Sequence, residues 1–561
     1  MNKNRKGFTI VELVIVIAII AILAAVLIPT FASLIQKANI SKDTQVIRNL
    51  NTAIATATEK PETMRDALKI AAEAGYLVDK INAAANGNDI LWDSENKVFC
   101  YYNAATKAVA YIPETKIETT NAPEYKFWKI YNDKMPELSE QRYSIYLTAN
   151  ATADEEVTVK VGFDAGDNTK VKTVNYKNDG AEQKVDIFTN GGNLIVNANN
   201  DTVSHFGEAD KVNVVAVADH SYYENGVASV LLITKGRVVV AKDAKIDMLI
   251  VEANDAKNVK LAVESGATIV SAKIPDGVEG KDSVVASDVT VVEVKDVTEL
   301  NNAVANPTNN VYVKLAADID ANSTSVTIAD NGGAYDITID GNGHTLTSKN
   351  NRVIQTCQKN ETNYTGILTI NNLNIVCAIN EVIDKNNTRG ISLWRFEGTL
   401  NFSRSKITMT AGCDNYGINL GGDQFSGATL NIKNSEITAF QCVNIYGTNE
   451  TVMVDSCKLN AVNEHNNSST GACVTVFEKS SATVSINNCT MTTKSAADKA
   501  PEYGVTFGSS LGKTIYANVT IDSCYLNGEK FVKENKYAFG YIDNNMANGS
   551  ITIDGNRIVS K

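Results

Sequence analysis

The chain has 561 residues, of which 44% are hydrophobic and 21% charged, a composition typical of a folded protein. Its length predicts roughly three or four domains. The net charge is −12 and the only basic block lies in the first six residues, so the sequence disfavours nucleic acid as a partner. The nine cysteines form no CxxC pair and there are only four histidines, so we expect neither a metal site nor a cofactor.

Residues 8–28 form an apolar run in which Glu12 is the single ionisable side chain. As a helix this run would be roughly 31 Å long, enough to cross a bilayer core of about 30 Å. The preceding Lys3, Arg5 and Lys6 predict a cytoplasmic N-terminus. A secretory signal peptide fits less well, because no A-x-A-like cleavage site follows the run and such peptides do not carry an acid inside it.

Glu12 is the unusual residue of this segment. A carboxylate inside the membrane costs roughly 2.5–3.5 kcal/mol, so it usually marks a partnered, functional position. Cleavage after Gly7 would make Phe8 a new amino terminus, one helical turn before Glu12. The Glu12 carboxylate could then pair with the Phe8 ammonium of a neighbouring copy, which would remove two buried charges together.

The stretch GFTIVEL, residues 7–13, resembles the leader junction of type IV pilins and of type II secretion pseudopilins. The resemblance implies that a prepilin peptidase cleaves between Gly7 and Phe8 and methylates Phe8. It also implies that Glu12 is the family's assembly glutamate. Pro29, residue 22 of the cleaved chain (29 − 7), matches the proline that commonly kinks pilin helices.

Residues 29–138 are expected to form a pilin-like stalk helix and α/β head. Apolar residues recur at helical spacing after Pro29, and a second short helix is predicted to end at Gly75. Three short apolar runs separated by turn-rich stretches then predict an antiparallel meander, at 89–92, 98–102 and 108–112.

Residues 139–292 are predicted to be rich in β-strands. Short apolar runs recur about every ten residues between small polar turns, which favours a solenoid over a sandwich. His205 has Asp201 and Asp210 nearby in the sequence. We interpret it as a hydrogen-bonding residue of a loop rather than as a catalytic group.

The C-terminal half contains an internal repeat. Segments that alternate apolar and polar residues and then turn, such as ITIDGNGHTL and LTINNLNI, start at residues 337, 368, 400, 430, 452, 484, 519 and 551. A second series, such as GISL and CVNI, starts at residues 390, 417, 442, 473 and 504. Two strand series that advance together predict parallel coils stacked around an apolar bore.

Five cysteines fall into the register of this repeat. Cys457, Cys489 and Cys524 share one turn position, and Cys442 and Cys473 share another. They could form disulfides between coils or a stack of buried thiols. We favour the thiols, because parallel in-register side chains point the same way.

Residues 293–561 resemble the right-handed parallel β-helices of the pectate-lyase-like class. The segment VTELNNAVAN, residues 297–306, is similar to their capping helix, and YDITIDGNGHTL to a first complete coil. This superfamily includes lyases, hydrolases and non-catalytic adhesins, so the resemblance implies a fold and not a chemistry.

Catalysis is disfavoured by the acidic residues of the repeat. Asp455, Asn487, Asp522 and Asp554 form its best acidic column, but each lies where a tight turn favours Asp or Asn. Three arginines in adjoining coils have no matching acid pair in the sequence, namely Arg389, Arg395 and Arg404. A tethered polysaccharide lyase or hydrolase is therefore the alternative and not the first hypothesis.

The sequence predicts a mainly β protein with a long N-terminal α-helix, a pilin-like α/β head, a β-rich middle region and a C-terminal right-handed parallel β-helix. The expected divisions are a leader (1–7), a membrane or filament-core helix (8–28), a stalk and head (29–138), a β-rich domain (139–292) and the β-helix (293–561).

The favoured function is a minor or tip pilin that displays the β-helix as an adhesin. A secretion pseudopilin is the closest alternative. The expected partners are the prepilin peptidase, other pilin subunits, the membrane before assembly, and a carbohydrate or cell-surface ligand. The chain would cross the membrane once and then lie in a surface filament. Four aromatic residues beside the loops are candidates for the ligand face, namely Tyr416, Phe425, Tyr446 and Tyr503.

Overall fold

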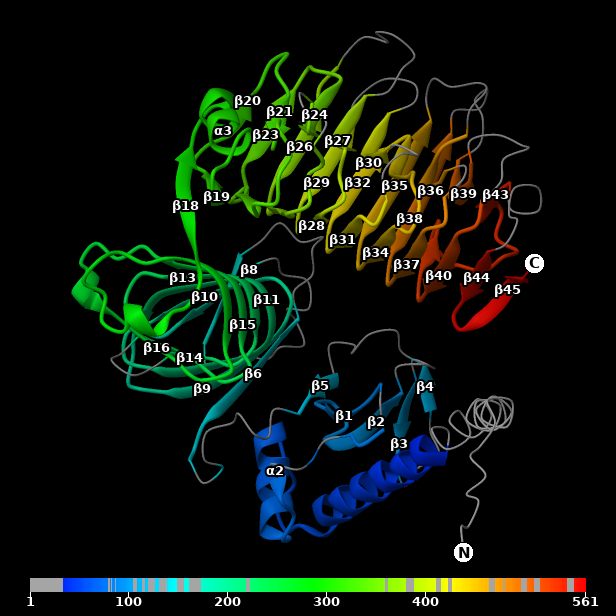
Figure 1. Ribbon diagram of the computed structural model, residues 1–561. Helices are drawn as coiled ribbons and strands as arrows, with labels where there is room; N and C mark the ends of the chain where they lie inside the picture. Colours follow the sequence, from blue (N-terminus) through cyan, green and yellow to red (C-terminus); the bar gives the residue numbers. More distant parts are fainter. Residues whose placement is uncertain are drawn as a thin grey trace, which may run out of the picture. The chain divides into compact units, whose positions relative to one another are not determined.

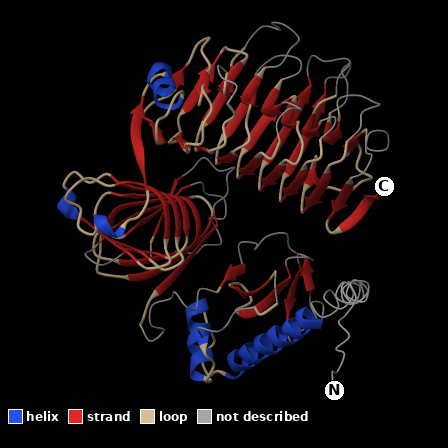
Figure 2. Cartoon of the chain, viewed as in Figure 1, coloured by secondary structure: helices blue, strands red, loops and turns tan. Residues whose placement is uncertain are grey.

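The structure is a computed structural model, and it divides into two compact units, residues 1–140 and 141–561. Figure 1 shows the chain coloured along the sequence, and Figure 2 shows its secondary structure. The described residues are 34–561 with the exception of 79–80, 82, 86, 104–107, 113–116, 120–126, 131–137, 139, 149–155, 161–172, 218–221, 359–361, 380–387, 410–414, 422–425, 464–469, 478–479, 496–501, 509–514, 542–548 and 561.

The first unit packs a helix, residues 34–56, against a small antiparallel sheet. Ile47 and Leu50 of this helix are fully buried, and the Asn51 side chain bonds both the N–H and the C=O of Phe99. The sheet order is β4-β3-β2-β1-β5, and the strands that could be expected from the sequence are its central three. Their bounds are β1 (Asn88–Asp93), β2 (Val98–Asn103), β3 (Ala108–Tyr111), β4 (Ile117–Thr119) and β5 (Phe127–Lys129).

The second helix of this unit, α2 (Met64–Glu73), begins and ends where its sequence predicts. The Thr63 hydroxyl accepts a hydrogen bond from the Asp66 N–H, and the Asp66 carboxylate accepts one from the Thr63 N–H, which together form a capping box. Gly75 follows the helix with φ 87°, a conformation that glycine adopts without strain. Local sequence therefore fixes both ends of α2.

The second unit begins with a parallel solenoid, which has two ladders of strands. Ladder A contains β7 (Glu156–Val159), β8 (Thr173–Lys177), β10 (Asn193–Ala198), the second half of β11 (Thr202–Val217), β13 (Val227–Ile233), β15 (Lys245–Val251) and β17 (Thr268–Lys273). Ladder B contains β6 (Tyr143–Thr148), β9 (Lys184–Asn190), the first half of β11, β12 (Tyr222–Glu224), β14 (Gly236–Val240) and β16 (Val259–Val263).

Each solenoid coil contributes one strand to each ladder. The paired residues Val174, Leu194, Val212, Leu231 and Leu249 lie 18 to 20 positions apart in the chain, and all are buried in one core. The middle region is therefore made of parallel coils with a continuous apolar interior.

Strand β11 belongs to both ladders because it bends at Gly207, which has φ 99°. A side chain there would collide with the carbonyl oxygen of Thr189 in the neighbouring coil. Only glycine therefore allows the coils to approach at this corner.

After β18 (Ser287–Val294) and the capping helix α3 (Val297–Val304), the chain forms a parallel β-helix with three walls. The first wall contains β19 (Asn310–Leu315), β22 (Ile337–Asp340), β25 (Ile367–Asn371), β28 (Thr399–Ser403), β31 (Thr429–Lys433), β34 (Thr451–Asp455), β37 (Thr483–Asn487), β40 (Asn518–Asp522) and β44 (Ser550–Ile553). The second contains β20 (Ile319–Asp320), β23 (Thr345–Ser348), β26 (Asn374–Cys377), β29 (Lys406–Met409), β32 (Glu436–Ala439), β35 (Lys458–Asn463), β38 (Thr490–Ser495) and β41 (Tyr525–Leu526). The third contains β21 (Val326–Ile328), β24 (Arg352–Thr356), β27 (Arg389–Trp394), β30 (Tyr416–Gly421), β33 (Gln441–Ile445), β36 (Ala472–Val476), β39 (Tyr503–Phe507) and β43 (Phe539–Gly540).

The repeat seen in the sequence corresponds to the first and third walls. Residues at the same repeat position pair in register, as in Ile337 with Leu368 and Val443 with Val474. The second wall was not separated in the sequence analysis, which counted two strand series where the structure has three sheets. The reason is that a tight turn joins each first-wall strand directly to the second-wall strand that follows it. The two strands therefore look like one segment in the sequence.

The far end of the β-helix finishes in two hairpins. β42 (Glu529–Lys530) pairs antiparallel with β41, and β45 (Asn556–Ser560) pairs antiparallel with β44. Figure 1 shows β45 in red beside β44 at this end of the stack. The ladder direction is thus reversed on two of the three walls.

The bore of the β-helix is apolar and contains seven of the eight described cysteines, and the other, Cys100, lies in β2. All eight cysteines that the structure describes are free and buried. Burial raises the pKa of Cys489 well above its usual value, as does its thiol neighbour Cys457. These side chains therefore act as small hydrophobic residues. The ninth, Cys413, lies outside the described residues.

Candidate ligand-binding face

The third wall brings together three of the four aromatic candidates. Tyr416 begins β30, Tyr503 begins β39, and Tyr446 directly follows β33. Phe425 lies outside the described residues, as do Gly7, Phe8, Glu12 and Pro29 of the N-terminal segment.

The centre of this wall is a column of polar side chains that alternates with the apolar residues of the bore. In-register pairing aligns Gln355, Ser392, Asn419, Asn444, Thr475 and Thr506 from six successive coils. We call these six residues the polar floor. The Asn444 amide donates to the Asn419 Oδ1 at 2.7 Å, and the Thr506 hydroxyl donates to Thr475 at 3.3 Å.

Three buried polar atoms of this wall have no hydrogen-bond partner in the part of the chain that the structure describes. They are Oδ1 of Asn444, Oε1 of Gln441, which begins β33, and Nε of Arg389, which begins β27. Asn444 is fully buried and Gln441 is 2% exposed. An unsatisfied buried amide costs about 1–3 kcal/mol, so such atoms call for an explanation.

Aromatic side chains stand on both sides of the polar floor. On one side the aligned positions are Arg352, Arg389, Tyr416, Gln441, Ala472 and Tyr503. On the other side Trp394 ends β27 and is 42% exposed, and the Tyr446 ring lies 3.8 Å from the Phe477 ring. Trp394, Phe477 and the polar floor were missed in the sequence analysis, because only the coil register shows that they share one face.

Arg389 is the main cation of this face. Its guanidinium lies 5.6 Å from the centre of the Tyr416 ring. Burial lowers the pKa of Arg389, and the neighbouring Arg352 adds to this effect. An arginine held beside a like charge and an aromatic ring is suited to polar or anionic groups of a ligand.

Two buried glutamates lie near the edges of the third wall, directly before β34 and β39. Burial raises the pKa of Glu450 to about 8 and that of Glu502 to about 9. Both side chains are therefore protonated at neutral pH. The Gly471 N–H donates to Glu502 at 3.2 Å, so this carboxyl group supports the neighbouring coil.

In the acidic column of the repeat, Asp455, Asn487 and Asp522 end first-wall strands directly before the tight turn, and Asp554 lies in a turn itself. The Asn488 amide donates to Asp455 at 3.1 Å, and the Ser523 N–H donates to Asp554 at 2.8 Å. These bonds hold turns whose residues have positive φ, such as Asn488 at 52°. Within the described residues there is no group of three or more potential metal ligands.

His205 requires a correction, because it lies in strand β11 and not in a loop. It is fully buried, its Nδ1 lies 2.8 Å from Glu224, and its Nε2 lies 2.6 Å from the Thr189 hydroxyl. The Tyr222 hydroxyl also donates to Glu224, at 2.8 Å. This network lies inside the solenoid core and does not face a ligand.

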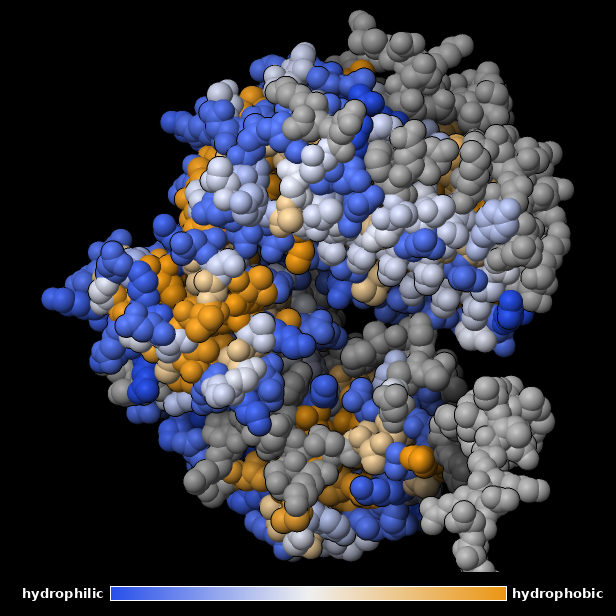
Figure 3. Space-filling model, viewed as in Figure 1, coloured by the Kyte–Doolittle hydropathy of each residue, from blue (hydrophilic) through white to orange (hydrophobic). Residues whose placement is uncertain are grey.

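Taken together, amide and hydroxyl groups flanked by aromatic rings are the chemistry that binds sugars, whose hydroxyls bond amides and whose C–H faces pack on rings. The surface of the β-helix in Figure 3 is mostly blue to pale, so it is polar rather than hydrophobic in that view. Among the described helices none is long and apolar enough to span a membrane, and the apolar run 8–28 lies outside them.

Comparison with known families matches two parts of the chain. Residues 2–28 match the model of the prokaryotic N-terminal methylation motif, and residues 291–410 match that of a putative pectate lyase-like adhesive domain. The class indicated is thus a protein with a type IV pilin-like N-terminus and a pectate lyase-like adhesive domain.

Similarity to individual proteins identifies the family. The chain is 34% identical over 111 residues to the fimbrial protein of Moraxella nonliquefaciens and covers 70% of that protein and 19% of its own length. It is 58% identical over 52 residues to the type IV wide pilus major component PilA4 of Thermus thermophilus. That match covers 9% of this chain and 37% of the Thermus protein. The chain belongs to the type IV pilin family.

Proposed function

We propose that the protein is a minor or tip subunit of a type IV pilus-like filament, and that it displays its β-helix as an adhesive module. The observation that carries this proposal is the presence, in one chain, of a pilin methylation motif and a pectate lyase-like adhesive domain. A unit of about four hundred residues beyond the pilin part would crowd a helical lattice, which favours a minor position over a major one.

The proposal includes the processing and placement of the N-terminal segment. The prepilin peptidase would cleave between Gly7 and Phe8 and methylate Phe8. Residues 8–28 would hold the subunit in the membrane with its N-terminus in the cytoplasm, until it assembles with other pilins. The stalk and head, residues 29–138, would have the pilin fold, and the β-helix would be right-handed. The antiparallel sheet packed on helix 34–56 supports the first of these two assignments.

The ligand face of the proposal is the third wall. Aromatic rings on both sides of the polar floor support a carbohydrate on a host or neighbouring cell as the ligand. Trp394 and Tyr446 are the residues expected to contribute most, because truncation of aromatic side chains costs most at binding sites.

Assembly can be tested through Glu12. Glu12→Ala should reduce incorporation into surface filaments at least tenfold, because the Phe8 ammonium of a neighbour would lose its buried partner. The measurement is immunogold counting on filaments, with the membrane-bound pool measured by immunoblot. Thr9→Ala is the matched control and should assemble normally. Normal incorporation of the Glu12 variant would contradict the pairing, and a protein found only in a short envelope-spanning structure would indicate a secretion pseudopilin.

Adhesion can be tested with a glycan array. The intact protein should bind a subset of glycans, and Trp394→Ala combined with Tyr446→Ala should weaken this binding at least tenfold. Tyr525→Ala is the control, because Tyr525 is 51% exposed on the second wall. Release of unsaturated or reducing sugars from the bound glycans would instead identify a polysaccharide-degrading enzyme.

A further inference from the structure

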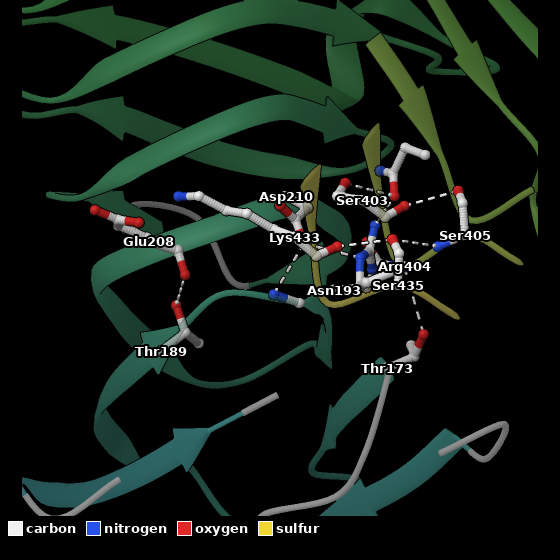
Figure 4. A network of polar contacts seen from close by, with 12 residues as sticks. Thr173, Thr189, Asn193, Glu208, Asp210, Ser403, Arg404, Ser405, Lys433 and Ser435 are labelled. Carbon is white, nitrogen blue, oxygen red and sulfur yellow. Dashed lines mark hydrogen bonds and ion pairs between the residues drawn. The ribbon is translucent and has the colours of Figure 1, made fainter. Parts of the chain in front are cut away.

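Two ion pairs join the solenoid to the β-helix. Asp210 and Lys211 are consecutive residues of β11, and each meets an opposite charge of the β-helix. The Asp210 Oδ2 lies 2.8 Å from the Arg404 Nε, and the Lys211 Nζ lies 2.5 Å from the Asp340 Oδ2. Figure 4 shows Asp210 and Arg404 in the first of these contacts. We call these four residues the clasp.

Arg404 is an unusual residue for its position. It occupies the tight turn between the first and second walls, where one residue has a positive φ in each coil from β22 to β40. The other residues at this turn are small and polar, namely Asn342, Asn372, Asn434, Ser456, Asn488 and Ser523. A long side chain tolerates this conformation less well than asparagine.

Arg404 also carries a buried charge. Its side chain is completely buried, and burial lowers the pKa of its guanidinium while Asp210 opposes this effect. The guanidinium also donates to Oδ1 of Asn371 in the preceding coil. Backbone strain and a desolvated charge at one position both cost free energy. The β-helix alone does not require them, because asparagine forms the same turn in other coils.

The second ion pair is reinforced by a tyrosine of the β-helix. The Tyr312 hydroxyl donates to the Asp340 Oδ2 at 2.6 Å, and the Lys211 ammonium donates to the Tyr312 oxygen at 3.2 Å. Burial alone would raise the pKa of Asp340, but Lys211 and these hydrogen bonds hold it below its ordinary value. Asp340 is therefore a carboxylate whose charge depends on a residue of the solenoid.

An apolar cluster lies beside the clasp. Val230, Leu232, Met248 and Ile250 alternate with core residues of ladder A, so they stand on the outside of the solenoid, yet they are at most 5% exposed. They pack with Val289 of β18 and Tyr312 of β19. Strand β18 itself pairs with β17 through Ser287 and Asp288 and with β19 through Val289–Val294.

We propose that the clasp fixes the docking register of the solenoid on the β-helix and so makes the two coil stacks one rigid arm. Consecutive residues of opposite charge meet partners of opposite charge in different coils. A shift by one coil would place Lys211 opposite Asn371 or Lys314, the residues that pair with Asp340 in the adjoining coils, and would so lose the ion pair. The apolar cluster favours contact between the two coil stacks but does not select one register. The clasp selects the register. This inference concerns the arm itself and does not depend on the ligand or on the filament.

The test measures a distance between the two coil stacks in the full chain, purified in detergent. The substitutions Lys260→Cys in the solenoid and Thr451→Cys in the β-helix would provide the two sites for spin labels, and Cys413→Ser would be the background. The other eight cysteines are buried and should not react. Electron–electron double resonance of the intact clasp should give one narrow distance distribution.

Opening the clasp should broaden that distribution at least twofold. The variant is Arg404→Asn with Lys211→Met, in which asparagine restores the residue type of the neighbouring turns and so leaves the coil able to fold. Lys530→Met is the matched control, because it removes a surface ion pair with Asp554 of 2.9 Å at the far end of the β-helix. It should leave the distribution unchanged.

A reversed pair provides the decisive comparison. Arg404→Asp combined with Asp210→Arg should keep the narrow distribution, whereas Arg404→Asp alone should broaden it. A narrow distribution in the opened variant, or a broad one in the folded reversed pair, would overturn the proposal. Circular dichroism monitors folding in every variant. If the opened variant loses its β signal, the proposal is judged from the distance distribution of the reversed pair.

Discussion

The solenoid and the β-helix both stack parallel coils around a buried core, but they use different numbers of residues for each coil. A solenoid coil uses 18 to 20 residues for two ladders, as the spacing of Val174, Leu194 and Val212 shows. A β-helix coil uses 22 to 35 residues, because it adds a third wall and longer connections (452 − 430 and 519 − 484). The additional chain creates a third wall with polar and aromatic side chains, so the longer coil is the one suited to carry function.

The two regions also differ in what they bury. The bore of the β-helix holds aliphatic side chains and free thiols, which need no partners. The solenoid core contains the linked polar groups of His205, Glu224, Thr189 and Tyr222. Polar networks of this kind tolerate substitution poorly, because each loss leaves a buried partner unsatisfied. The predictions below test this contrast, beginning with the largest effect.

A charge inside the bore should have the largest effect. Ile486→Lys places an ammonium between Val454 and Ile521 of the adjoining coils, which should cost more than about 4 kcal/mol and unfold the neighbouring coils. Ser485→Lys, one residue earlier on the outer face, should cost about 0.5 kcal/mol or less. Urea unfolding followed by limited proteolysis measures both, and similar losses would show that the two faces are not distinct.

The polar network of the solenoid should be nearly as sensitive. Glu224→Ala leaves His205 and Tyr222 without their partner and should destabilise the solenoid by about 3–5 kcal/mol. Glu279→Ala is the control, because its contact with Lys260 is an exposed ion pair worth about 0–1 kcal/mol. Hydrogen exchange in β11 and β12 would report the loss, and unchanged protection would mean that the network does not hold the coils together.

Alkaline pH should weaken the β-helix more than the solenoid. The pKa values of Glu450 and Glu502 are raised to about 8 and 9, so both bind protons more tightly in the folded than in the unfolded chain. Their contribution is therefore complete below about pH 4.5 and is lost progressively as the pH rises from there through 8 to 9. Glu450→Gln with Glu502→Gln should flatten the dependence of the melting temperature on pH. An equally steep slope in the variant would exclude these groups as its cause.

The thiol stack should tolerate a small change. Cys489→Ala removes one buried sulfur and should cost about 1–2 kcal/mol through the cavity that it leaves. In the folded protein a maleimide should leave the eight described cysteines unmodified, and all of them should react in denaturant. If disulfides joined the coils instead, the mass of the native protein would be lower by two hydrogens for each pair of cysteines.

The tight turns should give the smallest effect. Asn372 has φ 52°, so Asn372→Ala should cost about 1 kcal/mol while Asn372→Gly should be nearly neutral. Thermal unfolding of the two variants measures the difference. Equal stability of the alanine and glycine variants would show that the turn relaxes without strain.

Much of the fold could be predicted because it repeats. Ile337, Leu368 and Leu400 occupy equal positions in the repeat, and they pair in register as in-phase strands must. The second wall was missed because only two residues separate it from the first in most coils, too short a gap to recognise in the sequence. The aromatic candidates Tyr416, Tyr446 and Tyr503 could be named from their place beside loops.

Other features could not be predicted, because they depend on contacts between distant coils. Arg404 had no visible acid in its own repeat, since its partner Asp210 lies 194 residues earlier (404 − 210) in another domain. His205 was placed in a loop because its neighbours in sequence are acids, whereas its actual partner, Glu224, lies one coil further on. The polar floor likewise appears only when six coils are superposed in register.

The two hairpins at the end of the β-helix also determine how copies behave when crowded. A parallel stack with open edges could continue from one molecule into the next and grow into a fibre. Strands β42 and β45 run against the direction of their walls, so an incoming parallel coil would find a matching ladder on the third wall alone and could not continue the stack. Many arms held close together should therefore remain separate molecules, even at the high local concentration of a densely covered cell surface.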